Sequence, residues 1–187
     1  MLPLVRRCRR LYFSYLSQPS GDRVVYRQLS KRRVSKILEL GIGEGTRSLR
    51  MLELATHGQP PAAVSYTGVD LFESRSTTDG PGLSLKLAHQ RFKATGARVR
   101  LAPGDPYSAL SRIANELGAV DLMLISADQL GPSLAKAWFY VPRLLHAETQ
   151  VFIELAPSGD GKRRLSRLTH FEIKDRAAQA APRRMAA

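Results

Sequence analysis

The sequence has a single cysteine, no long hydrophobic run and no internal repeat, and each absence excludes a class of protein. Cys8 alone cannot form an internal disulfide, and one cysteine suits a reducing compartment. No stretch approaches the roughly 20 consecutive apolar residues that a membrane-spanning helix needs. Repeats at the spacing of a solenoid are also absent. We therefore expect a single-domain protein of 187 residues, located in the cytoplasm.

Acidic residues are scarce at both ends of the chain. Of the net charge of +13, residues 1–36 carry +9 and residues 162–187 carry +6, so the middle of the chain carries −2. Basic ends can bind phosphate groups by releasing counterions, which makes nucleic acid a candidate partner. Solvated tails explain the same charge, and no zinc-finger, KH or RNP motif accompanies it. Residues 1–20 also have the acid-free, Arg-rich composition of an organelle transit peptide.

Short apolar runs alternate with helix-forming segments from residue 34 onward. Strands are predicted over residues 34–40, 64–70, 98–102, 120–125 and 150–155, with helices over 46–57, 83–95, 106–117, 132–140 and 142–146. One further strand is predicted over 169–174. The alternation predicts a mostly parallel sheet with helices on both faces, which is a three-layer α/β fold.

A glycine-rich turn follows the first predicted strand. Gly41, Gly43 and Gly45 lie between that strand and a helix, where glycine permits unusual backbone angles and close approach of a ligand. A Walker loop requires Gly-Lys-Ser/Thr, but Gly45 is followed by Thr-Arg. A dinucleotide site typically has Gly-x-Gly-x-x-Gly, which is one residue longer than the spacing found here.

The sequence Glu-Leu-Gly-Ile-Gly-Glu-Gly at residues 39–45 resembles the cofactor turn of class I S-adenosylmethionine-dependent methyltransferases. Further similar segments follow in the family's order, at 64–70, Gly104-Asp105, 120–125 and 144–154. The resemblance covers about residues 34–155. It implies a Rossmann-like methyltransferase fold with truncated C-terminal strands, because only one strand fits after Leu155. It also implies S-adenosyl-L-methionine as the cofactor and methyl transfer to an unidentified acceptor.

The same resemblance implies a set of cofactor-binding residues: Glu39, Gly41, Gly43, Gly45, Asp70 and Asp105. Glu39 would orient the methionine end through backbone or water contacts, and the glycines would pack against methionine and ribose. Asp70 would accept hydrogen bonds from both ribose hydroxyls, and Asp105 would face the adenine amino group. Structural roles remain open for both aspartates, Asp70 as a loop cap and Asp105 as a helix N-cap.

The segment after the fourth predicted strand normally faces the methyl acceptor in this family. Here it is Ser-Ala-Asp-Gln at residues 126–129, similar to the Asp-Ala-Asp-Lys of metal-dependent catechol-type O-methyltransferases but lacking the first acid and the lysine. A divalent ion requires several carboxylate oxygens, so we expect no metal site. Asp128 is the one candidate for a catalytic base or orienting group.

The predicted organisation is a basic N-terminal segment (1–33), a methyltransferase-like domain (34–175) and a basic C-terminal tail (176–187). The predicted function is that of a methyltransferase. The alternative is a non-catalytic protein of the same fold that binds nucleic acid or an acidic partner through its basic ends.

Overall fold

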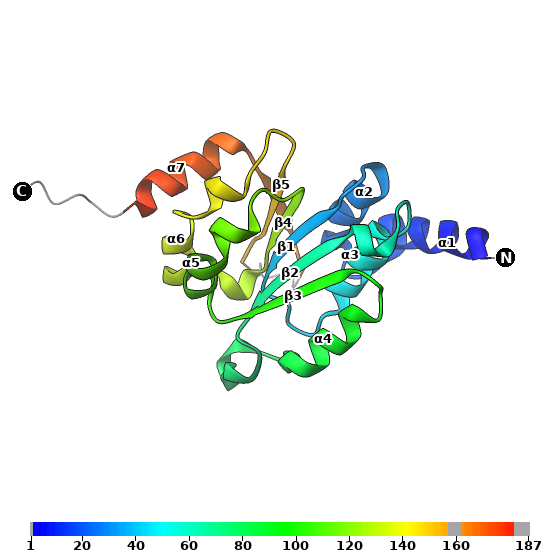
Figure 1. Ribbon diagram of the computed structural model, residues 1–187, viewed down its shortest axis with the longest axis horizontal. Helices are drawn as coiled ribbons and strands as arrows, with labels where there is room; N and C mark the ends of the chain where they lie inside the picture. The colour runs from blue at the N-terminus through cyan, green and yellow to red at the C-terminus, as the bar shows by residue number, and fades with distance from the viewer. Residues whose placement is uncertain (1, 157–161, 182–187) are drawn as a thin grey trace, which may run out of the picture.

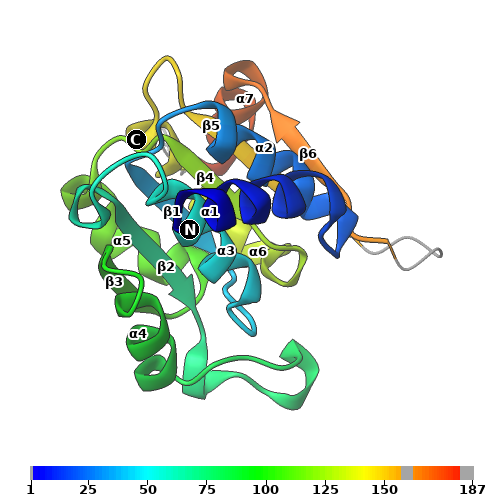
Figure 2. The same ribbon diagram turned by 90° about the vertical axis from the view of Figure 1, so that its right-hand side faces the viewer.

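The computed structural model describes residues 2–156 and 162–181, which form a three-layer α/β structure (Figure 1). Its sheet has the strand order β3-β2-β1-β4-β5-β6. The strands are β1 (Lys36–Leu40), β2 (Ser65–Asp70), β3 (Arg98–Pro103), β4 (Leu122–Ile125), β5 (Gln150–Glu154) and β6 (Leu165–Leu168). The first five strands are parallel, and β6 pairs antiparallel with β5 at the edge of the sheet (Figure 2). The direction of the strand order changes between β1 and β4, and ligands bind beside such switch points in open α/β sheets.

Helices cover both faces of the sheet. The helices are α1 (Leu2–Leu11), α2 (Arg23–Lys31), α3 (Thr46–Ala55), α4 (Leu85–Lys93), α5 (Pro106–Leu117), α6 (Pro132–Ala137) and α7 (His170–Ala180). The core on one face includes residues of α2, α3 and α4, and the core on the other includes residues of α5, α6 and α7 (Figure 1). No helix in the described residues is long and apolar enough to cross a membrane.

The central strands are buried on both faces, which explains their nearly continuous apolar sequences. Side chains of neighbouring residues in a strand point to opposite faces, so Ile37 packs in the core with α2 to α4 while Leu38 packs in the core with α5 to α7. All four residues of β4 are buried. The expected mostly parallel α/β architecture is therefore confirmed, with a single strand after β5 in the described part of the chain.

The predicted strand over residues 169–174 is wrong, because this segment begins α7. The Thr169 hydroxyl accepts a hydrogen bond from the backbone N–H of Glu172 at 3.2 Å, and the Glu172 carboxylate accepts one from the backbone N–H of Thr169 at 2.7 Å. These reciprocal bonds form a capping box, which satisfies donors at the start of a helix. The strand that follows β5 lies just before, at Leu165–Leu168.

Two parts of the chain differ from the sequence expectation by more than one or two residues at an end. The helix predicted over 132–140 ends at Ala137, and a 3-10 turn follows at Val141–Leu144, where Pro142 lacks the N–H that would continue an α-helix. Within residues 1–33, α2 buries Val25 and Tyr26 in the core, so part of this basic segment packs with the sheet.

Candidate functional site

A cavity of about 400 Å³ opens where β1 and β4 end. Its walls include the glycine turn at 41–45 and the segment 126–128 that follows β4. Charged side chains from helices, strands and other connections also line it: Asp22, Arg47, Arg50, Arg75, Asp79, Glu154 and Arg163. The volume lies within the range of pockets that hold small ligands.

All three glycines of the turn line the cavity, and each has a positive φ, of +86° at Gly41, +57° at Gly43 and +75° at Gly45. A Cβ at Gly41 would lie 2.6 Å from Asp128 Oδ1, and one at Gly45 would lie 2.7 Å from Leu83 Cδ1. A Cβ at Gly43 would meet nothing closer than the Pro81 carbonyl oxygen at 3.9 Å. Packing therefore requires glycine at positions 41 and 45, whereas Gly43 faces open space.

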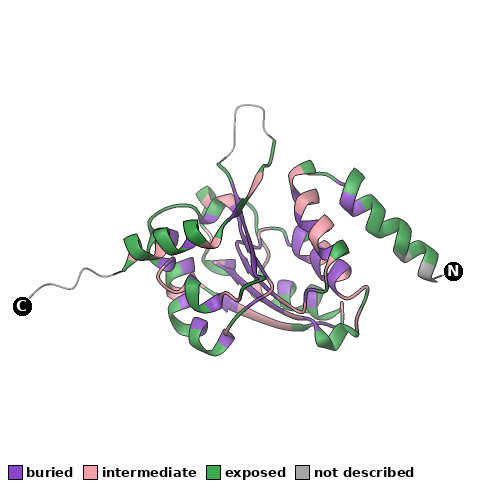
Figure 3. Ribbon diagram, turned by 90° about the horizontal axis from the view of Figure 1, so that it is seen from above, coloured by how far each residue is buried: buried purple, intermediate pink, exposed green. Residues whose placement is uncertain are grey.

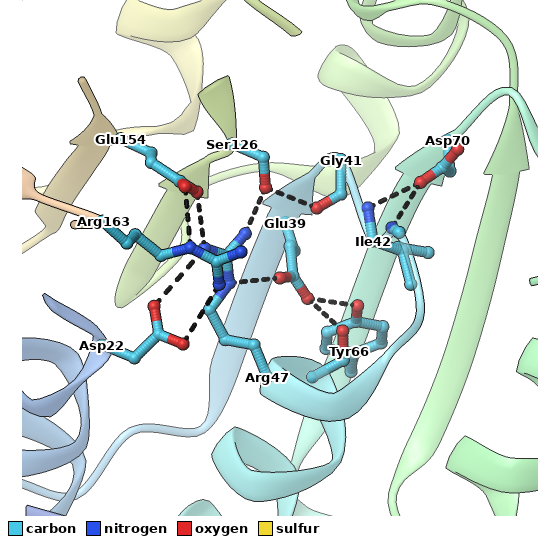
Figure 4. A network of polar contacts seen from close by, with 12 residues as sticks. Asp22, Glu39, Gly41, Ile42, Arg47, Tyr66, Asp70, Ser126, Glu154 and Arg163 are labelled. Atoms are coloured by element: carbon cyan, nitrogen blue, oxygen red, sulfur yellow. Dashed lines mark hydrogen bonds and ion pairs between the residues drawn. The ribbon is translucent and has the colours of Figure 1, made fainter. Parts of the chain in front are cut away.

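Asp70, the last residue of β2, holds the glycine turn in place. Its Oδ2 accepts hydrogen bonds from the backbone N–H groups of Ile42 at 2.7 Å and Gly43 at 2.9 Å (Figure 4). Burial acts to raise the pKa of this carboxyl, but Arg75 and the two N–H groups outweigh burial and hold the pKa below its ordinary value. Asp70 is 2% exposed and does not line the cavity.

Arg75 covers Asp70 on the side of the cavity. It follows the 3-10 turn Phe72–Ser74, and its guanidinium binds Asp70 through Nε to Oδ1 at 2.7 Å and Nη2 to Oδ2 at 2.8 Å. Nη2 also donates to Oδ2 of Asp128 at 2.8 Å. Arg75 thus bridges the end of β2 and the segment after β4, and both oxygens of Asp70 are engaged by it.

Asp128 lies in the 3-10 turn Ala127–Gln129 and lines the cavity. Its side chain is 32% exposed, and its partner is Arg75. The candidate base from the sequence is therefore accessible from the cavity but held in an ion pair.

A second arginine, Arg47, lies in the first turn of α3 at the centre of a buried cluster (Figure 4). Its Nη1 lies 2.8 Å from Glu154 Oε2 and 3.6 Å from Asp22 Oδ1, and its Nε lies 3.1 Å from Glu39 Oε1. Its Nη2 donates to the Ser126 hydroxyl, which in turn donates to the Gly41 carbonyl at 2.6 Å. Ser126 therefore ties this cluster to the glycine turn, and the cluster itself forms part of the cavity wall.

Glu39 belongs to this cluster and does not line the cavity. It is fully buried, and its Oε2 accepts hydrogen bonds of 2.6 Å from both Tyr66 Oη and Ser48 Oγ. Burial raises the pKa of the Glu39 carboxyl above its usual value, although Arg47 and the two hydroxyls act in the opposite direction. Its role in orienting a ligand remains a prediction, and in the structure its partners are protein groups.

Asp105 is the N-cap of α5. It accepts hydrogen bonds from the N–H groups of Tyr107 at 3.0 Å and Ser108 at 3.2 Å, and from the hydroxyl of Ser133. Burial acts to raise the pKa of Asp105, but these donors lower it to about 2. Asp105 does not line the cavity, so its contact with adenine remains a prediction while its capping role is visible.

Asp22, Arg75 and Arg163 also belong to this region, and no pattern in the sequence indicated them. Arg163 binds Glu154 at 2.8 Å and Asp22 at 3.3 Å, and so links the β5–β6 connection to the cluster. None of the three lies in a recognisable motif. Across residues 2–156 and 162–181, no group of three or more His, Cys, Asp or Glu side chains is arranged to hold a metal ion.

No protein-family model and no curated protein matches this sequence. Solved structures do match. A TehB-like SAM-dependent methyltransferase from Corynebacterium glutamicum aligns with a TM-score of 0.51 and 19% identity, over 95% of this chain and 80% of that one. The O-methyltransferase TomG from Streptomyces achromogenes, in complex with SAM, aligns with a TM-score of 0.53 and 17% identity, over 74% of this chain and 56% of TomG.

The chain has the class I methyltransferase fold. At identities of 17–19%, the similarity to these structures concerns the fold. The fold that the sequence resemblance implied is therefore confirmed. In this methyltransferase fold the glycine turn follows the first strand and the cavity lies at the switch between β1 and β4.

Proposed function

We propose that this protein is an S-adenosylmethionine-dependent methyltransferase. The observation that carries the proposal is the glycine turn at 41–45, which ends β1, is tied to Asp70 at the end of β2 and borders a cavity of about 400 Å³. Further support comes from TomG, which shares the fold and was crystallised with SAM.

The residues around the turn fit an adenosyl ligand under one condition. Gly43 leaves its side of the turn open, and Asp70 is the strand-end carboxylate that would accept hydrogen bonds from the ribose hydroxyls. Both oxygens of Asp70 are bound by Arg75, however, so Arg75 has to leave Asp70 when ribose binds. Arg75 belongs to the connection 71–84 between β2 and α4, and its withdrawal requires no change in the sheet.

S-adenosylmethionine, when bound, supplies an activated methyl group on a sulfonium. The protein then has to align the acceptor and exclude water, which requires no obligatory catalytic motif. Asp128 lines the cavity and pairs with Arg75. Once Arg75 withdraws, the Asp128 carboxylate is free to orient the acceptor or to take a proton from it.

Calorimetry with S-adenosylhomocysteine tests the proposal. We expect saturable binding by the intact protein and a large loss of affinity in Asp70→Asn, which cannot accept two charge-assisted hydrogen bonds from the ribose. Because Asp70 also holds the glycine turn, the variant's far-UV circular dichroism and melting temperature are measured alongside. Glu116→Gln is the matched control, since Glu116 is an exposed acid that pairs with Arg100 and does not line the cavity.

Transfer of tritium from labelled S-adenosylmethionine into small-molecule, protein and RNA fractions then identifies the class of acceptor. Failure of the intact protein to bind either S-adenosylmethionine or S-adenosylhomocysteine would overturn the proposal. Retention on RNA without any binding of these ligands would instead support the non-catalytic alternative.

A further inference from the structure

An exposed apolar face runs along α1 and the π-helical turn Tyr12–Leu16 that continues it. Six large hydrophobic residues are exposed there: Leu4, Val5, Leu11, Tyr12, Tyr15 and Leu16. The rest of the described chain exposes five, scattered over separate elements: Leu87, Tyr107, Leu130, Leu155 and Phe171. Figure 3 shows α1 projecting from the body of the protein, with mostly exposed residues along it.

The exposed hydrophobic residues lie on one side of the helix. Positions 4, 5, 8, 11, 12, 15 and 16 recur at intervals of three and four, which is the spacing of one helical face. The opposite side attaches the helix to the body. There Phe13 packs against Tyr26 with 6.1 Å between ring centroids, and Arg9 pairs with Glu53 at 2.8 Å. The apolar face therefore points away from the core that it would otherwise join.

The charge around this apolar face indicates which kind of partner binds it. Residues 1–21 contain four arginines and no acidic residue, and Arg7, Arg9 and Arg10 are all exposed. A second copy of the chain would bring the same arginines together, which like-charge repulsion opposes. Nucleic acid would pair with the arginines but would leave the leucine and valine side chains in water. An anionic lipid surface accommodates both, with apolar side chains among the upper acyl chains and arginines at the phosphates.

We propose that residues 4–16 bind the surface of membranes that contain anionic phospholipid. About 15 helical residues span roughly 22 Å, less than the roughly 30 Å hydrocarbon core of a bilayer, so the helix lies along the surface. Tyr12 and Tyr15 suit this position because their rings are apolar and their hydroxyls are polar. This proposal is independent of methyl transfer.

Co-sedimentation of the full chain with lipid vesicles tests the proposal. We expect binding to vesicles of equimolar phosphatidylcholine and phosphatidylglycerol, and much weaker binding to phosphatidylcholine alone. Raising the salt concentration should weaken the binding without abolishing it, because salt screens the arginines but not the apolar contacts.

Two variants separate the apolar and the charged contributions. Leu11→Ser with Leu16→Ser keeps every charge and should lower partitioning about tenfold or more. Arg7→Gln with Arg10→Gln should lower partitioning onto the anionic vesicles by about tenfold and leave the weak binding to neutral vesicles unchanged. Phe171→Ser is the matched control, since Phe171 is an 81% exposed hydrophobic residue on α7, and its partitioning should equal that of the unaltered protein.

Several outcomes would overturn the proposal. One is no preference for anionic over neutral vesicles, and another is an equal loss in Phe171→Ser. A dimer that the leucine substitutions convert to monomer, seen by light scattering, would assign the face to a second copy. Binding of RNA that depends on the arginines and not on the leucines, without binding to vesicles, would assign it to nucleic acid. All substituted side chains are exposed, and circular dichroism verifies that each variant is folded.

Discussion

The side chains of Arg47 and Arg75 are each 7% exposed and both bind carboxylates, yet the two arginines belong to different kinds of structure. Arg47 lies in a helix, and its three acidic partners come from β1, β5 and the turn before α2. Arg75 lies in a connection between elements, and one of the two carboxylates that it pairs with, that of Asp128, is 32% exposed. Both arginines line the cavity. Arg47 joins regular elements beside the glycine turn, whereas Arg75 joins the end of β2 to the segment after β4, and the proposed function requires it to leave Asp70.

The acids around the two arginines differ in the same way. Burial raises the pKa of Asp22 and of Glu39 despite the proximity of Arg47, so these carboxyls are costly to keep charged. The pKa of Asp70 is lowered, because Arg75 and two backbone N–H groups outweigh its burial. Without Arg75, Asp70 would keep three backbone donors, the N–H groups of Ile42, Gly43 and Phe72. Without Arg47, the acids around it would keep side-chain donors: two hydroxyls at Glu39, and Arg163 at Asp22 and Glu154.

The largest expected effect is that of Arg47→Met. Removal of the guanidinium leaves buried carboxyls without their main partner, which destabilises a protein by about 3–5 kcal/mol. Denaturant unfolding measures the change. Arg100→Met is the control, because the pair of Arg100 with Glu116 is exposed and should contribute at most about 1 kcal/mol. Similar losses in the two variants would contradict the structural role assigned to Arg47.

Arg75→Ala is expected to have a smaller effect, and a favourable one, on the affinity for the ligand. If Arg75 competes with ribose for Asp70, its removal should tighten binding of S-adenosylhomocysteine by about tenfold, which corresponds to one hydrogen bond to a charged group. Calorimetry measures the affinity, and Arg112→Ala serves as the control because Arg112 is an exposed arginine that does not line the cavity. Weaker binding in Arg75→Ala would show that the guanidinium contacts the ligand. Arg75 would then stay in place like Arg47, and would not leave Asp70 when the ligand binds.

The smallest effect concerns Asp105, a strand-end acid that helix N–H groups stabilise in place of an arginine. Asp105→Ala should destabilise the protein by about 1 kcal/mol, the usual contribution of an N-cap. The folded-state pKa is lowered to about 2, so the carboxylate's contribution is present above its ordinary pKa near 4 and is lost as the pH falls through about 2. Unfolding curves of both proteins should therefore converge at low pH, and a difference that widens there would contradict the cap.

The arrangement of strands and helices could largely be predicted because its causes are local. Apolar runs such as residues 120–125 are needed where a strand is buried on both faces, and glycine is needed where the backbone turns beneath a ligand cavity. The error at 169–174 is also local. The Thr169–Glu172 capping box starts a helix there, and it outweighs the weak apolar alternation of this segment.

The candidate site could be predicted only in part. The glycine turn and Asp128 do line the cavity, whereas Glu39, Asp70 and Asp105 are held by protein groups. A motif shows which residues lie near a strand end, but it does not show which other side chains reach them.

The sequence by itself determined the order of the elements, the glycine turn and the concentration of positive charge at the ends, because each depends on neighbouring residues. Only the tertiary structure decided which acids meet which arginine. Arg47 and Glu154 are 107 positions apart, and they meet because β4 alone separates β1 from β5 in the sheet. Arg75 reaches Asp128 from 53 positions away for a similar reason, since the ends of β2 and β4 flank β1. Strand order sets such contacts, and no local pattern in the chain encodes it.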